Sequence, residues 1–195
     1  MARKAKIRRK TTETDISIEI NLDGIGEGKI YTTIPFMDHM LNLFARHSLV
    51  DLILNGKGDT HIDDHHLVED IGICLGDALK KSLGDKKGIA RYGSAIVPMD
   101  ESLCNVVIDI SGRPYLIYNV EFKSRKIGKF DYSLIREFFK SFSDHSGMTL
   151  HINLMYGKNN HHMAEAAFKA FALALRKAVT IHGRIEGILS TKGSL

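Results

Sequence analysis

Histidines and acids are concentrated between His61 and Asp70, where ten residues hold three histidines and four carboxylates. Imidazole and carboxylate ligands suit Mn, Fe, Co, Ni or Zn. The centre of the stretch is His65-His66-x-x-Glu69, and apolar residues follow it with a helical period. In a helix both histidines lie near Glu69, but adjacent rings diverge by about 100°. The motif therefore predicts two ions that take one ring each.

The same motif returns as His161-His162-x-x-Glu165, again at the start of a predicted helix. N-terminal capping by acids and histidines would explain one copy but does not predict a duplication, so a metal site is the favoured interpretation. The six side chains give three ligands per ion. His39, on the helix predicted before the first motif, is a further candidate, and Glu137 is its counterpart in the second half. His47 and His145 are alternatives at helix ends.

Basic residues near these motifs could bind an anion. Lys169 follows Glu165 by four positions and interrupts a helix that is otherwise rich in Ala, Phe and Leu. A snorkelling lysine is the alternative interpretation. Arg91, Arg113 and Lys192 stand at turns or strand ends, where guanidinium and ammonium groups suit phosphate. Ser190-Thr191-Lys192 could form a small anion nest.

The elements around the motifs repeat along the chain. Each half is predicted as strand-strand-strand-helix-strand-helix, with residues 1–90 and 91–195 as the two repeats of one compact unit. The predicted strands are 5–10, 14–22, 29–34, 50–54, 92–97, 103–110, 115–122 and 149–156, and the predicted helices are 37–48, 65–83, 134–142 and 161–179. This order predicts an α+β fold in which each half has an antiparallel sheet of about four strands with both helices on one face. The duplication predicts pseudo-twofold packing of the two units.

Composition narrows the class of protein. The chain has 195 residues, 44% hydrophobic and 26% charged, as in ordinary globular proteins. It has no apolar run long enough for a membrane span and no secretory leader at its start. Cys74 and Cys104 indicate reduced core thiols of a cytoplasmic protein. Six of the first ten residues are Lys or Arg, which suggests a nucleic-acid arm. A solvated basic strand is favoured, because no aromatic stacking platform accompanies the charge.

Nine segments of the chain match a known family in order. They are FMDHML (36–41), DDHHLVED (63–70), GIARYG (88–93), MDE (99–101), SGRPY (111–115), SGMTLH (146–151), GKNNHH (157–162), EAAFKA (165–170) and STKG (190–193). With these segments the sequence closely resembles the imidazoleglycerol-phosphate dehydratases of histidine biosynthesis, in their monofunctional form. The resemblance implies dehydration of imidazole glycerol phosphate to imidazole acetol phosphate, and a fold like domain 2 of ribosomal protein S5.

The resemblance also implies a site with two manganese ions. The implied metal ligands are His39, His65, His66, Glu69, His161, His162 and Glu165, and the implied substrate contacts are Glu13, Arg91, Arg113, Lys169, Ser190 and Lys192. At Glu137 the chain departs from a pattern with histidine, which leaves this ligand open. The expected catalytic set is Glu13, His39, His66 and Glu165. Glu13 is the candidate acid/base because it has no ligand role. A cytoplasmic homo-oligomer of 24 subunits is implied, with sites at subunit interfaces and no nucleic-acid or membrane partner.

Two other functions remain open at this point. A di-metal hydrolase could activate water on a phosphoester, and it would release inorganic phosphate rather than a keto phosphate. A metal-binding protein without catalytic activity could use the basic N-terminal segment to associate with RNA. Such a protein would show salt-sensitive RNA binding and no turnover of an imidazole substrate.

Overall fold

The computed structural model describes residues 3–195 and has the element order expected for an internal duplication. The first half contains β1 (Lys4–Lys10), β2 (Thr14–Asn21), β3 (Gly28–Tyr31), α1 (Pro35–Ser48), β4 (Asp51–Gly58) and α2 (His65–Leu83). The second half contains β5 (Tyr92–Met99), β6 (Ser102–Asp109), β7 (Tyr115–Asn119), β8 (Lys126–Ile127), β9 (Phe130–Asp131), α3 (Ser133–Ser146), β10 (Thr149–Tyr156) and α4 (Asn160–Val179). All twelve predicted elements are present, and the short β8–β9 pair is an addition within the predicted basic loop.

The two four-stranded sheets have the same topology, β1-β2-β4-β3 and β5-β6-β10-β7. The prediction of purely antiparallel sheets was wrong at one edge of each. β3 runs parallel to β4, and β7 runs parallel to β10. The reason is the helix that connects each of these strand pairs, because a helical crossover returns the chain to the same end of the sheet.

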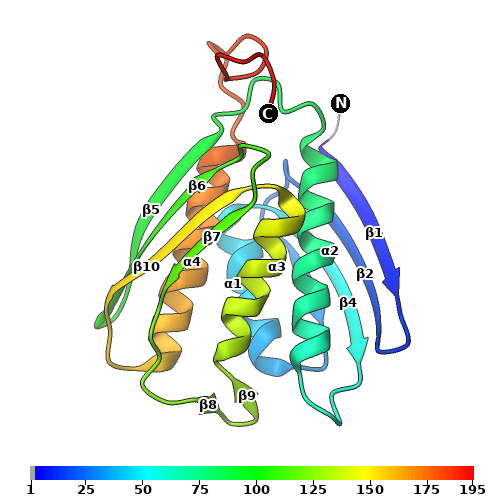
Figure 1. The fold of residues 1–195 in the computed structure, drawn as a ribbon, viewed down its shortest axis with the longest axis vertical. Coiled ribbons are helices and arrows are strands. Elements are labelled where there is room, and N and C mark those ends of the chain that lie inside the picture. The colour runs from blue at the N-terminus through cyan, green and yellow to red at the C-terminus, as the bar shows by residue number, and fades with distance from the viewer. Residues whose placement is uncertain (1–2) are drawn as a thin grey trace.

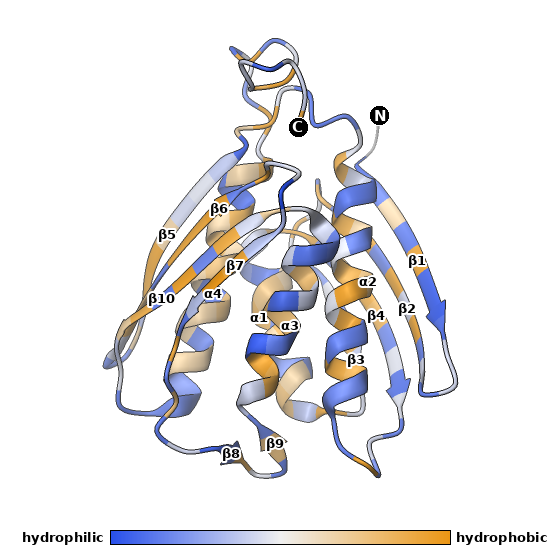
Figure 2. Ribbon diagram, viewed as in Figure 1, coloured by the Kyte–Doolittle hydropathy of each residue, from blue (hydrophilic) through white to orange (hydrophobic). Residues whose placement is uncertain are grey.

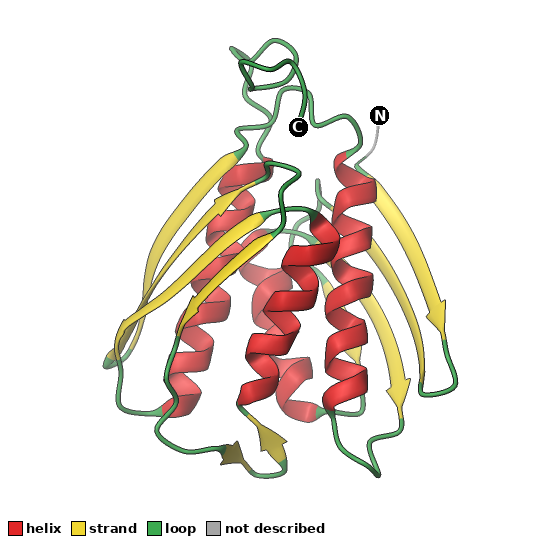
Figure 3. Cartoon of the chain, viewed as in Figure 1, coloured by secondary structure: helices red, strands yellow, loops and turns green. Residues whose placement is uncertain are grey.

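The four helices lie between the two sheets, as Figures 1 and 3 show. Strand residues alternate between buried and exposed, so each sheet turns one apolar face to the helices and one polar face to solvent (Figure 2). The prediction that both helices of a half cover one face of its sheet is therefore confirmed. Across the middle, α1 packs against α4 and α2 packs against α3, so each helix meets a helix of the other half.

Phenylalanine rings hold the two halves together. Phe44 of α1 stacks on Phe171 of α4 with ring centroids 5.5 Å apart, and both rings are fully buried. On the other side of Phe171 lie Phe139 and Phe142 of α3, each 5.2 Å away in edge-to-face geometry. Buried aromatic pairs stabilise a core beyond the area that they bury. This cluster fixes α1 against α4, and the metal-ligand candidates of both helices lie at that contact.

Two glycines allow α2 and α3 to approach closely, and replacing one of them is expected to destabilise the protein. A Cβ atom on Gly76 would lie 2.8 Å from the carbonyl oxygen of Phe142, and one on Gly72 would lie 2.7 Å from that of Phe138. Overpacking of this kind costs about 1–3 kcal/mol. For Gly76→Ala we expect a lower free energy of unfolding in denaturant, although alanine favours a helix by about 1 kcal/mol. Lys80→Ala, on the exposed face of α2, is the control, and equal midpoints for both variants would contradict this account.

Candidate active site

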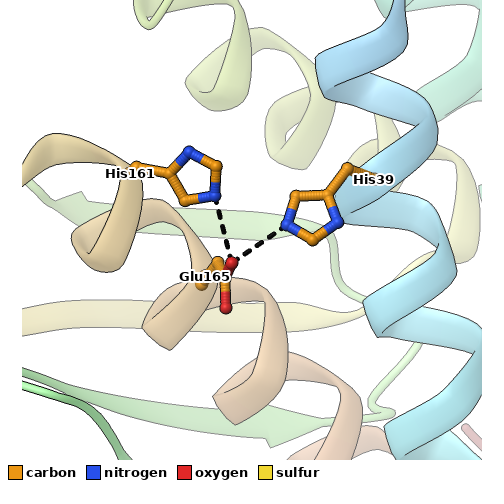
Figure 4. A group of neighbouring side chains, drawn as sticks. All are labelled: His39, His161 and Glu165. Carbon is orange, nitrogen blue, oxygen red and sulfur yellow. Dashed lines mark hydrogen bonds and ion pairs between the residues drawn. The ribbon is translucent and has the colours of Figure 1, made fainter.

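Three metal-ligand candidates converge between α1 and α4. The Nε2 atoms of His39 and His161 lie 2.9 and 3.0 Å from the same oxygen, Oε1 of Glu165. One ligand atom from each of the three side chains falls within 4.8 Å of the others, and Figure 4 shows both imidazoles directed at the carboxylate. Within residues 3–195 this is the one group of three or more such side chains that converges. Its spacing and mixture of donors suit a divalent transition metal.

The start of α4 sets the direction of these side chains. The side chain of Asn159 caps the helix by accepting a hydrogen bond from the backbone N–H of His161. His161 and Glu165 are then i, i+4 neighbours on one helical face, as predicted. The rings of His161 and His162 are 6.5 Å apart at 83°, so His162 faces another direction. The predicted divergence of adjacent histidines is therefore confirmed.

Glu165 is a buried acid that the structure keeps ionised. Burial opposes its ionisation, but hydrogen bonds from Lys169 and His39 outweigh that effect and lower the pKa of Glu165 to about 2. The Nζ atom of Lys169 lies 2.6 Å from Oε2 of the carboxylate. Lys169 therefore lies beside the metal-ligand candidates, on the helical face where its spacing from Glu165 placed it.

The first HHxxE motif begins α2 with the same i, i+4 spacing, but its histidine and glutamate lie farther apart than those of the second motif. Nε2 of His65 lies 3.7 Å from Oε2 of Glu69, and both side chains are about half exposed. The rings of His65 and His66 are 6.2 Å apart at 86°. Glu137, the predicted counterpart of His39, lies on α3 and binds the adjacent Arg136 at 3.0 Å. None of these residues joins the His39 group within one chain.

Each second histidine is bound by an acid from outside its helix. Nδ1 of His66 lies 3.0 Å from Asp59, and Oε2 of Glu13 is 3.9 Å away. Nδ1 of His162 lies 2.7 Å from Glu101. These hydrogen bonds raise the pKa of both imidazoles, and the bond from His162 holds the pKa of Glu101 well below its usual range.

Four of the predicted substrate contacts meet at the far end of α4. Arg91, Arg113, Ser190 and Lys192 line a pocket of about 880 Å³ together with Tyr92 and residues of the C-terminal tail. The guanidinium of Arg91 is buried, makes two hydrogen bonds to Asp109 and donates a third to the carbonyl of Leu189. The backbone of Arg91 is left-handed, with φ +68°. Such strain in a non-glycine residue is typical of functional positions.

This basic pocket and the His39 group lie at opposite ends of α4. The backbone N–H of Arg91 bonds the carbonyl of Ala178, near the last turn of α4, whereas His161 is in the first turn. Between them the helix is about 25 Å long at a rise of 1.5 Å per residue. The structure therefore places the predicted substrate contacts at three points. Four line the basic pocket, Lys169 lies beside the His39 group, and Glu13 lies beside His66.

Comparisons with known proteins identify the family of the chain. The family model described as imidazoleglycerol-phosphate dehydratase matches residues 32–175. The chain belongs to the imidazoleglycerol-phosphate dehydratase family. The curated dehydratase of Syntrophus aciditrophicus is 64% identical over 99% of this chain and 98% of its own length, and that of Geobacter metallireducens is 58% identical over the whole of both chains.

Solved dehydratases have the same fold. The crystal structure from Staphylococcus aureus has a TM-score of 0.84 at 42% identity and covers 92% of this chain and 99% of its own. The structure from Pyrococcus furiosus, in complex with (S)-C348, has a TM-score of 0.83 at 40% identity and covers 97% of this chain and all of its own.

As a dehydratase of this family, the chain removes water from imidazole glycerol phosphate in histidine biosynthesis. The family is metal-dependent, and the His39 group is a fitting place for a metal ion. Membership sets aside the alternatives of a phosphoester hydrolase and of a protein without catalytic activity.

Within residues 3–195 no helix is long and apolar enough to cross a membrane. The basic segment near the N-terminus forms edge strand β1, where Lys6 pairs with Glu19 and Arg9 with Asp70.

The sequence interpretation of this dehydratase missed two acids. Asp59 and Glu101 were given no role at the site, although each binds a histidine of a HHxxE motif. For Glu101 the repeat itself was a usable signal, because it immediately precedes β6 as Glu13 immediately precedes β2. For Asp59 we find no such signal, since the loops before α2 and α4 differ in length.

Proposed function

We propose that this dehydratase uses two Mn²⁺ ions per active site, held by its two HHxxE motifs and by His39. The observation that carries the proposal is the convergence of His39, His161 and Glu165 on one point. His65 and Glu69 repeat the geometry of His161 and Glu165 on α2. Glu137 is included with them because α3 packs on α2 as α1 packs on α4. When bound, the ions supply Lewis acidity that stabilises negative charge developing on the substrate.

The complete site is proposed to form between subunits of a 24-subunit shell. Within one chain, about 25 Å of helix separates the basic pocket from the His39 group. A small phosphorylated substrate is too short to contact both. The adjacent, diverging histidines of each motif support the same conclusion, because each helix then offers ligands in two directions.

Different side chains are proposed to bind the phosphate, to contact the rest of the substrate and to accept the proton. Arg113, Ser190 and Lys192, with Arg91 behind them, bind the phosphate by charge-assisted hydrogen bonds. Lys169 reaches the substrate from the histidine side. Glu13 accepts the proton from the carbon next to the ring-attached carbon, hydroxide leaves the ring-attached carbon, and the resulting enol relaxes to the ketone.

The reaction is proposed to take place in the cytoplasm. Cys74 and Cys104 are buried free thiols on different elements. Burial raises the pKa of each thiol to about 12. Such thiols are unreactive and suit a reducing compartment.

The experiment that tests the metal proposal follows the keto product from imidazole glycerol phosphate while Mn²⁺ is removed and restored. Bound metal is counted at each point. We expect no turnover after chelation, and full recovery as occupancy reaches two ions per chain. Recovery that is complete at one ion per chain would contradict the two-ion proposal without affecting the assignment of the family.

Loss of a charge in the basic pocket is expected to weaken substrate binding selectively. A hydrogen bond to a charged group contributes about 1.5–3 kcal/mol, so Arg113→Ala and Lys192→Ala should each raise the substrate Kd about tenfold or more. Bound Mn²⁺ should not change. Lys80→Ala, on the exposed face of α2, is the control. If a phosphate-free analogue loses as much affinity as the substrate, these residues do not bind the phosphate.

Removal of the metal is expected to lower the mass of the particle as well as the activity. Ions bound between chains favour the assembled state, because only assembly brings both sets of ligands together. The measurement is light scattering before chelation, after chelation and after Mn²⁺ is restored. A particle whose mass stays constant while its metal is fully removed and returned would argue against metal sites at the interfaces.

A further inference from the structure

The second histidine of each HHxxE motif is tied to a carboxylate through Nδ1. His66 faces both oxygens of Asp59, at 3.0 and 3.2 Å, and His162 faces Oε2 of Glu101 at 2.7 Å. The first histidines differ, since His65 and His161 approach the glutamate of their own motif through Nε2. The pairing with an outside acid is therefore specific to one histidine of each motif.

A carboxylate at Nδ1 determines whether the other ring nitrogen, Nε2, can act as a metal ligand. It accepts a hydrogen bond from Nδ1–H and so favours the tautomer in which Nε2 carries a free lone pair. It also fixes the plane of the ring. Acids in this position behind metal-binding histidines commonly change metal affinity 10- to 100-fold.

Glu101 is itself held in place before any ion binds. Its Oε1 atom accepts hydrogen bonds from the backbone N–H groups of Lys158 and Asn159, at 3.1 and 2.7 Å, and from the hydroxyl of Ser102. These donors come from the first residue of β6 and from the loop that leads into α4. With Oε1 engaged in this way, Oε2 is left for His162.

Comparison of the two halves explains why the first half needs Asp59. Glu101 and Glu13 occupy equivalent positions, one residue before β6 and β2. In the second half this glutamate binds the histidine directly. In the first half Glu13 stays 3.9 Å from His66 and half exposed, and Asp59 from the β4–α2 loop makes the bond instead. The substitution of one acid for another leaves Glu13 unbound beside the site.

We propose that Glu101 and Asp59 are positioning residues, which orient His162 and His66 with Nε2 free for metal, and that Asp59 thereby leaves Glu13 available to the substrate. This inference rests on the proposed metal function of the two histidines. It goes beyond that function by assigning a role to two acids outside the motifs and by explaining how the duplicated halves differ.

The test is the affinity of the protein for Mn²⁺, measured by competition with a chelator in Glu101→Gln and Asp59→Ala. In Glu101→Gln the amide oxygen can keep the backbone hydrogen bonds of Oε1, so the amide N–H₂ faces Nδ1 and drives the proton of His162 onto Nε2. We expect affinity to fall 10- to 100-fold, with little change in the thermal unfolding midpoint of the metal-free protein. Glu121→Gln, at an exposed glutamate far from the motifs in sequence, is the matched control.

The outcomes separate this inference from the proposed metal site. Weaker Mn²⁺ binding in Glu101→Gln and Asp59→Ala at an unchanged unfolding midpoint supports the positioning role. Wild-type affinity in both variants overturns it. If His162→Ala also keeps wild-type affinity, the proposed metal site fails as well, whereas a loss in His162→Ala alone would leave the metal site standing without the positioning acids.

Discussion

Replacing His161 with alanine is expected to abolish turnover and to remove most of the metal from one of the two proposed ion positions. Three ligand atoms within 4.8 Å hold that position, from His39, His161 and Glu165. Loss of one imidazole leaves two protein ligands, and ligand number decides both affinity and geometry at such sites. His39→Ala should have the same effect, although His39 lies outside both motifs and in the other half of the chain.

The measurement is bound Mn²⁺ per chain together with the rate of keto product formation. His151→Ala, on β10 and outside the HHxxE motifs, is the control for loss of a histidine. A His161→Ala enzyme that keeps its full metal and its full rate would show that the group in Figure 4 is not a metal site. Loss of the rate with full retention of metal would instead assign His161 to the substrate.

The sequence was sufficient to predict the elements and much of the histidine group, because both depend on local patterns. The HHxxE motifs place ligands on one helical face by spacing alone, and apolar residues of period 3.6 mark α2 and α4. The period-2 alternation of Ile16, Ile18 and Ile20 likewise marks β2. His39 was predicted as a further candidate because it lies on the helix before the first motif.

Contacts between distant residues were harder to predict. The parallel edges, β3 with β4 and β7 with β10, depend on which end of the sheet each crossover helix returns to. The bond between Glu101 and His162 joins residues 61 positions apart through two turns. Neither has a periodic signal in the sequence, because both arise only when the sheet and helices are assembled.

The sequence also did not predict that the basic residues lie at different ends of α4. Arg91, Arg113 and Lys169 have the same chemistry, and spacing does not tell which end of α4 each one reaches. In the structure Arg91 lies at the C-terminal end of α4, where the hydrogen bond from its backbone N–H to the carbonyl of Ala178 fixes its strained conformation. Lys169 pairs with Glu165 instead, and this difference supports the proposal that the completed site forms between neighbouring subunits.

Changing Glu13 to glutamine is expected to lower turnover about 10²- to 10⁴-fold, the usual contribution of a general base. Glutamine keeps the shape of the side chain but cannot accept the proton. Among residues 3–195, Glu13 has one ion-pair partner, His66, at 3.9 Å. Because Asp59 makes the bond to His66, the variant should keep its metal content and its substrate affinity.

Exchange, in deuterated solvent, of the substrate's C–H on the carbon next to the ring-attached carbon identifies the lost step. The wild-type enzyme should catalyse this exchange, and Glu13→Gln should not, at equal occupancy by substrate and Mn²⁺. Glu27→Gln, an exposed glutamate in the loop before β3, is the control for loss of a carboxylate. If Glu13→Gln exchanges and turns over at wild-type rates, proton removal belongs to another group. If exchange persists while turnover falls, Glu13 acts after proton removal, in the departure of hydroxide from the ring-attached carbon.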